Sequence, residues 1–337
     1  MRIEQFDPAS DAERLTACYD IVVAGNPVDH PSLPARPLRA FRSEWTLSYD
    51  SAPSEAWLAT DDSGEPVGCY LLHLPVNENV TLARVIVQVP PARRRAGIGT
   101  VLLEHCAGRA RRAGRARMGG EARDGSAGAA FAEAAGAKAG LAGATRILDI
   151  DASLPARLDR LGAEAQARAT GYSLLSWLGR TPEQHLGEVA RLNNAMTAAP
   201  QDEGVQAARW DGQHVAEQEA HALAHGLRLR TVAARHDGTG ELAALTQICT
   251  DDGTPGWAFQ HITAVTKEHR GHRLGLLVKI ANLKQLTSDD PSVQHILTGN
   301  AGANRHMIAI NEMLGFHVGD QYRSWGLDLA AGIDAPR

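Results

Sequence analysis

The apolar residues of the chain occur in two kinds of run, and the order of these runs repeats. Short runs rich in β-branched and aromatic residues, such as residues 82–89 and 257–265, are typical of strands. Longer runs with apolar residues three or four positions apart, such as residues 98–113 and 271–287, predict helices. Along the chain the pattern predicts the order β-α-α-β-β-β-α-β-α-β-β twice, with a period of about 170 residues.

A repeated order of elements predicts two homologous domains in one chain. We assign residues 1–150 to an N-terminal domain and residues 170–330 to a C-terminal domain, joined by a linker helix at residues 151–169. Each domain is expected to be α/β, with a mixed β-sheet flanked by helices. Other expected elements are helices at 10–23 and 38–49 around a turn at 27–37, and two short last strands at 316–319 and 322–329.

Length, charge and cysteine content narrow the class of protein further. The chain has 337 residues, enough for one or two domains with proper cores. Its formal net charge of −5 argues against a nucleic-acid partner. Its four cysteines are far apart, which predicts free thiols in a reducing compartment and argues against a zinc site. With no signal-like N-terminus and no long uncharged run, we expect a cytoplasmic protein with no membrane partner and no metal.

The most informative feature is a short basic turn that follows a predicted strand and opens a predicted helix. Backbone N–H groups at a helix N-terminus point at an anion, the helix dipole favours it, and glycine lets it approach closely. The turn is therefore predicted to be an anion cradle. It occurs twice: over Val89, Arg94, Arg95, Ala96, Gly97, Ile98, Gly99 and Thr100, and over Val265, Arg270, Gly271, His272, Arg273, Leu274 and Gly275.

This element order, with the cradle after the fourth strand, resembles the GCN5-related N-acetyltransferase (GNAT) superfamily in a tandem two-domain form. The family hallmark is Arg/Gln-x-x-Gly-x-Gly/Ala. The first cradle matches it fully from Arg94 to Gly99, whereas the second has Arg273 in place of the first glycine. The resemblance implies acetyl-CoA as co-substrate, with its pyrophosphate on the cradle and its pantetheine beside the preceding strand. Arginines near a cradle suit the phosphates of CoA.

The resemblance also implies where the chemistry lies. In the family a backbone N–H on the fourth strand polarises the thioester carbonyl, by register near Val265 or Val89, and the base lies on the same strand. Because strand side chains alternate, Thr263 and His261 are expected on the face of Val265, whereas valines hold these positions in the first half. Histidine titrates near neutral pH, so His261 is our candidate general base. The competing interpretation is a structural or exposed strand histidine.

Asparagines after the fifth strand are candidates for the pantetheine site. Asn300 and Asn304 resemble the family's pair at this place, and the alternative for each is an N-cap or turn residue. Many family members protonate the CoA thiolate with a tyrosine. Asn311 holds that position in the second half and Ala132 in the first, so the general acid is unassigned.

These features favour catalysis in the C-terminal domain, with an N-terminal domain that is structural and able to bind acetyl-CoA; the opposite assignment stays open. The leading hypothesis is acetyl transfer from acetyl-CoA to a primary amine of a small molecule, such as a natural product, an antibiotic or a thiol-cofactor precursor. The alternatives are a catalytically degenerate acyl-CoA-binding or scaffold protein and a protein-lysine acetyltransferase. We expect a monomer or homodimer, with acceptor contacts from residues 26–37, 197–212 and 257–260, Gln247 and Cys249.

Overall fold

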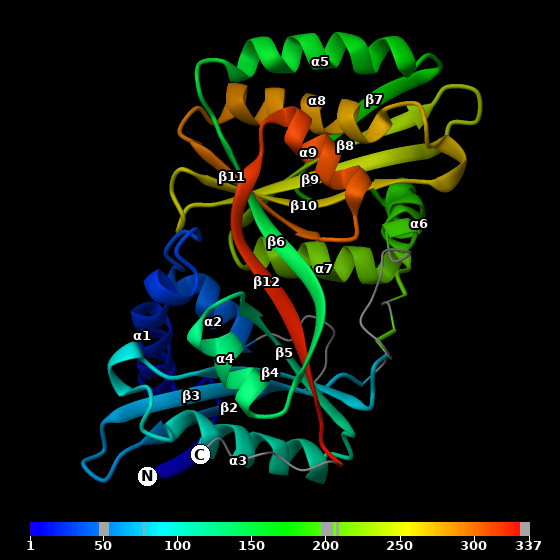
Figure 1. The fold of residues 1–337 in the computed structure, drawn as a ribbon. Coiled ribbons are helices and arrows are strands. Elements are labelled where there is room, and N and C mark those ends of the chain that lie inside the picture. Colours follow the sequence, from blue (N-terminus) through cyan, green and yellow to red (C-terminus); the bar gives the residue numbers. More distant parts are fainter. Residues whose placement is uncertain (47–53, 77, 197–204, 207–208, 331–337) are drawn as a thin grey trace. The chain divides into compact units, whose positions relative to one another are not determined.

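The structure of the chain, a computed structural model, describes residues 1–46, 54–76, 78–196, 205–206 and 209–330. These residues form two compact units (Figure 1). Unit 1 holds the described residues up to Gly143, those at 205–206 and those from Asp320 onward, and unit 2 holds the residues between. The predicted mixed α/β class is confirmed. Two strands, β6 (Lys138–Asp149) and β12 (His317–Asp328), each begin in one unit and end in the other.

Unit 1 is built on strands in the order β1-β2-β3-β4-β5-β12. These neighbours are antiparallel except for β4 and β5, which are parallel. Helices α1 and α2 cover one face through apolar residues around Phe41, and α3 covers the other through residues around Tyr70 and Leu102. The elements are β1 (Arg2–Phe6), α1 (Ala12–Asp29), α2 (Leu38–Thr46), β2 (Ser54–Thr60), β3 (Pro66–His73), β4 (Leu82–Gln88), the 3₁₀ turn η1 (Pro91–Arg93), α3 (Ile98–Arg112), β5 (Arg117–Arg123) and α4 (Ala127–Ala134).

Unit 2 repeats this plan with the strand order β6-β11-β10-β9-β8-β7. Again one internal pair, β10 and β11, is parallel, and β7 to β10 are antiparallel. Helices α5 and α8 lie on one face, and α6 and α7 on the other. The elements are α5 (Leu154–Arg168), β7 (Tyr172–Leu178), η2 (Glu183–His185), α6 (Leu186–Met196), α7 (Gly212–Ala224), β8 (Leu227–His236), β9 (Leu242–Asp251), β10 (Trp257–Val265), η3 (Lys267–His269), α8 (Leu274–Asp289), β11 (His295–Ala301) and α9 (Arg305–Leu314).

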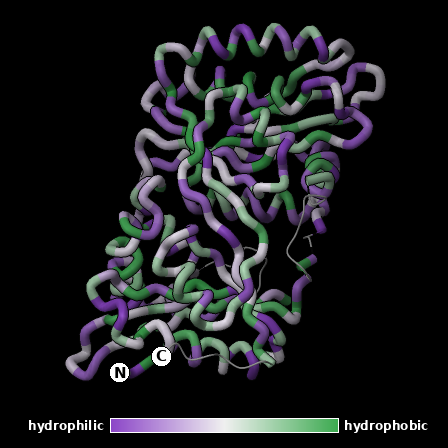
Figure 2. The backbone as a smooth tube through the Cα atoms, viewed as in Figure 1, coloured by the Kyte–Doolittle hydropathy of each residue, from purple (hydrophilic) through white to green (hydrophobic). Residues whose placement is uncertain are grey.

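The helix that the sequence placed in a linker, at residues 151–169, is α5 and belongs to the core of unit 2. Leu154, Leu158 and Leu161 are buried in the same apolar cluster as the residues of α8. Figure 1 shows α5 on the outer side of α8, and Figure 2 shows polar and apolar positions alternating along it. The interpretation as a linker was therefore wrong, because leucines at helical spacing have to be covered by a neighbouring helix.

Two other expected elements differ in extent. The two last strands, 316–319 and 322–329, are one continuous strand, β12, which pairs with β5 from Tyr322 to Asp328. Helix α1 continues through Pro27 to Asp29, because a proline in the last turn removes a single backbone donor. The predicted helix 38–49 ends at Thr46 in α2, and its remaining positions lie outside the described residues.

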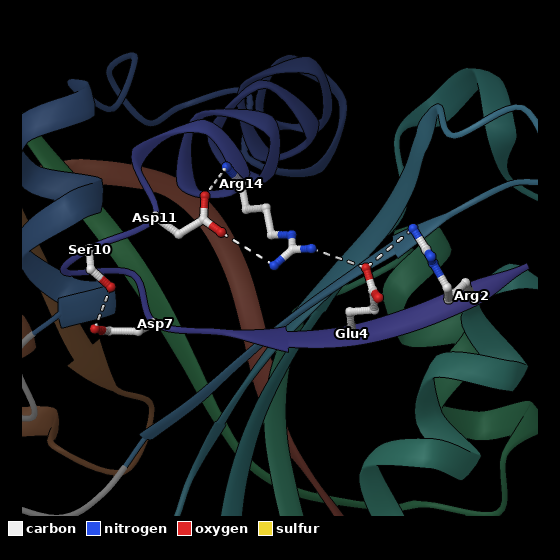
Figure 3. A network of polar contacts seen from close by, with 6 residues as sticks. All are labelled: Arg2, Glu4, Asp7, Ser10, Asp11 and Arg14. Atoms are coloured by element: carbon white, nitrogen blue, oxygen red, sulfur yellow. Dashed lines mark hydrogen bonds and ion pairs between the residues drawn. The ribbon is translucent and has the colours of Figure 1, made fainter.

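A polar network fixes the first strand of unit 1 to the start of α1 (Figure 3). Asp11 caps the helix by accepting a hydrogen bond from the backbone N–H of Arg14 at 3.0 Å. The guanidinium of Arg14 in turn lies 3.1 Å from Glu4 on β1. These side chains are partly open to water, so the network orients the helix more than it stabilises the fold.

Candidate functional site

Each unit contains one pair of parallel strands that begins paired and then separates. In unit 1, β4 and β5 pair from Leu82 to Arg84 only, although β4 continues to Gln88. In unit 2, β10 and β11 pair from Trp257 to Phe259 only, although β10 continues to Val265. The regular pairing of each strand pair therefore stops before the cradle, and we call the region between the two strands beyond this point the wedge.

The two cradles adopt the same backbone conformation. Helix α3 begins after Gly97, which is left-handed with a φ of 78°, and α8 begins after Arg273, which is left-handed with a φ of 55°. Two positions earlier in each cradle a second residue is left-handed: Arg95 at 64° and Gly271 at 90°. Both turns are also closed by equivalent backbone hydrogen bonds, Arg94 N to Pro91 O and Arg270 N to Lys267 O. Arg273 thus takes the conformation of the hallmark glycine.

The cradle arginines of unit 1 are engaged by acidic residues of the same unit. Both terminal nitrogens of Arg94 donate to the carboxylate of Asp29 on α1, at 3.0 and 2.5 Å, and its Nε donates to Val89 O at 3.0 Å. Arg93 lies 3.4 Å from Asp61. A bidentate arginine–carboxylate pair is strong and directional. Arg94 therefore holds the turn against α1, whereas Arg95 is exposed.

The cradle of unit 2 presents more open cations. Among the described residues, no hydrogen bond or ion pair involves the side chain of Arg270, and Arg273 contacts only Glu164, at 3.5 Å. Behind the turn, Nδ1 of His269 lies 2.8 Å from the hydroxyl of Tyr172, and the ring of His272 lies 5.3 Å from that of Tyr172. Desolvation lowers the pKa of His269, with a smaller contribution from a neighbouring histidine. The turn is anchored by aromatic contacts that leave Arg270 open.

The last glycine of each cradle faces its wedge. A Cβ on Gly99 would lie 3.4 Å from the ring of Phe131 on α4. A Cβ on Gly275 would lie 3.4 Å from Ile310 on α9 and 3.5 Å from Val265, with Thr263 close by. A side chain at either position would therefore enter the space between the cradle helix and the following helix. In unit 1 an aromatic ring already borders that space.

The strand β10 contains a β-bulge that β4 lacks over its described pairs with β3. The register of β10 with β9 shifts between Gln260, opposite Ile248, and Thr263, opposite Thr246. Two residues of β10, His261 and Ile262, therefore lie opposite a single residue of β9, Gln247. In unit 1, β4 keeps continuous register with β3 from Arg84 to Gln88. A bulge leaves backbone groups outside the ladder and often lies beside a functional site.

The bulge overturns the expectation that His261 shares a face with Thr263 and Val265. Thr263 and Val265 approach Gly275, on the α8 side of the sheet. His261 contacts Cys249 on β9. Cys249 and Gln247 are two positions apart and share a face of the sheet, and the side chain of Gln247 lies 3.5 Å from Glu219 of α7. His261 therefore lies on the α7 side. Simple alternation fails because the extra residue shifts every side chain before it by one position.

His261 is exposed, and its pKa is lowered. Its side chain is open to solvent. Enough protein surrounds the ring that desolvation lowers the pKa of His261. Its Nε2 lies 3.1 Å from Sγ of buried Cys249. A neutral imidazole at neutral pH is the protonation state that a general base requires.

The two expected pantetheine asparagines occupy different settings. Asn304 is the N-cap of α9, and its side-chain oxygen accepts from the N–H of Met307 at 3.2 Å. Asn300 is buried, and its side-chain oxygen accepts a 2.8 Å bond from the amide of Asn311. Oδ1 of Asn311 is buried and has no hydrogen-bond partner among the residues that the structure describes. Asn311, at the position of the family tyrosine, therefore supports Asn300.

Gln260, which lies in the segment expected to contact the acceptor, is buried at the bulge, and the sequence analysis missed a second buried polar residue, Lys279. The amide of Gln260 lies 2.8 Å from Gln247 O and 3.2 Å from Ile262 O, so it binds backbone carbonyls at the bulge. Lys279 is buried on α8 with its Nζ 5.3 Å from the ring centre of Phe316, and burial lowers the pKa of Lys279 to about 7. A lysine inside an all-apolar helical run is the signal that could have identified it.

In the described part of the chain, no group of three or more histidine, cysteine, aspartate or glutamate side chains is arranged to hold a metal ion. None of its helices is both long enough and apolar enough to cross a membrane. Of the expected acceptor loop at 197–212, residues 197–204 and 207–208 lie outside the described residues.

The sheet repeated in both units, with one partly paired parallel strand pair and a cradle at a helix N-terminus in each, is the arrangement that the resemblance to GNAT acyltransferases led us to expect. Residues 15–136 match the acetyltransferase (GNAT) family model. A tandem GNAT protein from the clavulanic acid biosynthesis pathway has 29% sequence identity and a TM-score of 0.80, with 97% of this chain and 98% of that chain covered. The chain therefore contains a segment that matches the GNAT acetyltransferase family, and over nearly its whole length it is similar to a tandem GNAT protein.

Two more distant structures agree in fold alone. A GCN5-related N-acetyltransferase from Sphaerobacter thermophilus is 16% identical, with a TM-score of 0.69 over 99% of this chain and 97% of that one. A putative acetyltransferase from Pyrococcus horikoshii is 14% identical, with a TM-score of 0.55 over 99% and 92%. No curated protein matches the chain significantly.

Proposed function

We propose that unit 2 transfers the acetyl group of acetyl-CoA to a primary amine of a small molecule, with His261 as general base. The observation that supports this proposal is the bulge in β10, where the register with β9 shifts and His261 is exposed. The cradle from Arg270 to Gly275 would receive the pyrophosphate. Pantetheine would run along Thr263 and Val265, past Gly275 and toward Asn300.

In the proposed step, residues of unit 2 hold the acetyl-CoA, polarise its thioester carbonyl and accept the proton of the amine. A backbone N–H at the bulge, at His261 or Ile262, would donate to the thioester oxygen as negative charge develops there. The N–H donor proposed here therefore differs from the one expected from the sequence: it lies at the bulge and not at Val265, which pairs in register with Ala244. His261 would take the amine proton as the amine attacks the acetyl carbon directly. The general acid stays unassigned.

A small-molecule acceptor is supported by the tandem relative, which belongs to the biosynthetic pathway of a small molecule, clavulanic acid. We propose a cytoplasmic monomer or homodimer with neither nucleic acid nor membrane as partner. The four cysteines are free and buried, which fits a reducing compartment. The identity of the amine and the acyl length are left to experiment.

Unit 1 is proposed to be structural and able to bind acetyl-CoA without turnover. Arg94 is held by Asp29, Phe131 borders its wedge, and Val85 has the same sequence offset from its cradle as His261 has in unit 2. These observations favour a scaffold role for this unit. If both units behaved in this way, the chain would be an acyl-CoA-binding protein without turnover.

The test is the rate of CoA release with a panel of small amines and lysine peptides, using the wild type, His261→Ala and, as matched control, Val85→Ala. For an accepted amine we expect His261→Ala to lower kcat/KM by roughly 10²- to 10⁴-fold and to leave acetyl-CoA binding unchanged. Because the pKa of His261 is lowered, wild-type kcat/KM should rise with pH through a midpoint below 6.5. Equal loss in both variants, or none in either, would refute the assignment; acceptance of peptides alone would favour a protein-lysine acetyltransferase.

A further inference from the structure

The candidate base His261 makes one side-chain hydrogen bond, and its partner is a thiol. Nε2 of His261 lies 3.1 Å from Sγ of Cys249 on the adjacent strand β9. Cys249 is 1% exposed. Burial, with the carboxylate of Asp251 nearby, raises the pKa of Cys249 to about 12. The thiol therefore keeps its proton and is a neutral neighbour held by the sheet.

The second ring nitrogen of His261 is open. Nδ1 has no hydrogen-bond partner among the described residues, and the side chain is exposed. A neutral imidazole carries its proton on one nitrogen and accepts on the other. If the proton lies on Nε2, it points at Sγ and leaves the lone pair on Nδ1 free. If it lies on Nδ1, the lone pair of Nε2 is turned toward the thiol and away from any substrate.

We propose that Cys249 is a positioning residue: its sulfur holds the proton of His261 on Nε2, so that Nδ1 is the atom that takes the amine proton. This inference rests on the proposed function, because it takes His261 as the base. The amine lone pair forms the new C–N bond, and its proton passes to Nδ1. The C–S electron pair leaves with the CoA thiolate, which is protonated by water. Throughout, Nε2–H continues to donate to Sγ.

A thiol suits this purpose because it orients the ring without charging it. A carboxylate in the same place would favour the imidazolium and raise its pKa. Sulfur is a weak acceptor with no charge. Desolvation alone accounts for the lowered pKa of His261. Of the acidic groups on this side, Asp251 acts on Cys249, and Glu219 of α7 is bound by Thr181 at 2.6 and 2.7 Å.

The experiment reads the tautomer of His261 by long-range ¹H–¹⁵N NMR in the ¹⁵N-labelled full chain, for the wild type, Cys249→Ser and Cys249→Ala. The wild type should be protonated on Nε2. The serine variant should stay so because its oxygen also accepts. The alanine variant should mix both tautomers and lose kcat/KM roughly two- to fivefold, in proportion to the competent fraction. Its KM for acetyl-CoA and its Tm control for a structural effect.

Two results would overturn the inference. One is a wild-type ring protonated on Nδ1. The other is an alanine variant with the wild-type tautomer and pH profile of kcat/KM. If Cys249→Ala failed to fold, the wild-type tautomer and the serine variant would still decide. Failure of the proposed function is distinguishable, because it shows as an active His261→Ala variant whatever the tautomer.

Discussion

The cradles of the two units share a backbone and differ in the side chains around it. Each has two left-handed residues at equivalent positions, but glycine and arginine exchange places: Arg95 and Gly97 in unit 1, Gly271 and Arg273 in unit 2. A non-glycine residue in this conformation costs about 1–2 kcal/mol. The turn is therefore robust enough to form with either arrangement, and a departure from the family hallmark is no sign that the geometry is lost.

What separates the units is the strand that precedes the cradle and the wedge beside it. In unit 1, β4 is regular, and Phe131 borders the wedge at Gly99. In unit 2, β10 is bulged at His261 and the wedge is bordered by smaller or aliphatic side chains. The comparison shows that the cradle arginine Arg94 of unit 1 is paired with a carboxylate, whereas Arg270 and His261 of unit 2 are exposed.

The largest expected effect on stability comes from the position one helical turn after the last cradle glycine, which is Leu103 in unit 1 and Lys279 in unit 2. Burial lowers the pKa of Lys279 to about 7 from 10.5, so between these values the unfolded chain binds more protons and stability rises with pH. Lys279→Leu should raise the free energy of unfolding at pH 7, by on the order of 3 kcal/mol, and less at pH 9.5. Leu103→Met is the control.

Calorimetric unfolding at the two pH values measures this difference. An equal gain at both would mean that Lys279 is not held neutral by burial.

A smaller effect is expected from the equivalent arginines Arg94 and Arg270. Arg94→Ala removes a bidentate pair with Asp29 and should lower the free energy of unfolding by about 1–3 kcal/mol. Arg270→Ala should leave stability unchanged and weaken acetyl-CoA binding roughly tenfold, because its guanidinium is open. Thermal unfolding and calorimetric titration of both variants separate the roles; the opposite distribution of effects would reverse them.

The smallest effect concerns the left-handed arginine of unit 2. Arg273→Gly restores the family hallmark and should raise the free energy of unfolding by about 1 kcal/mol, because the conformation no longer strains a Cβ. Its contact with Glu164 is exposed and should matter little. The comparison variant, Gly97→Ala, should lose a similar amount. A destabilised Arg273→Gly would show that the arginine side chain itself holds the cradle.

The parts of the fold that depend on local sequence could be predicted. The cradles follow from a basic, glycine-containing turn between a strand and a helix. The repeated order of elements was enough for the tandem architecture.

The parts that depend on long-range register could not. The bulge at His261 arises from a one-residue difference in length between paired segments of β10 and β9. The pattern of residues in β10 alone does not predict it. The proximity of Cys249 follows from the same register. Likewise, the passage of β12 from one unit to the other depends on its pairing with β5, far away in sequence.

The central claim is that unit 2 holds the acetyl-CoA that reacts, and calorimetric titration of acetyl-CoA into Gly99→Trp and Gly275→Trp tests it most directly. Each tryptophan would fill one wedge, against Phe131 or against Ile310 and Val265. We predict that Gly275→Trp abolishes acetyl-CoA binding at the site where turnover occurs, whereas Gly99→Trp keeps wild-type binding at that site. Loss of that binding in Gly99→Trp, with wild-type binding in Gly275→Trp, would contradict the account and assign the donor site to unit 1.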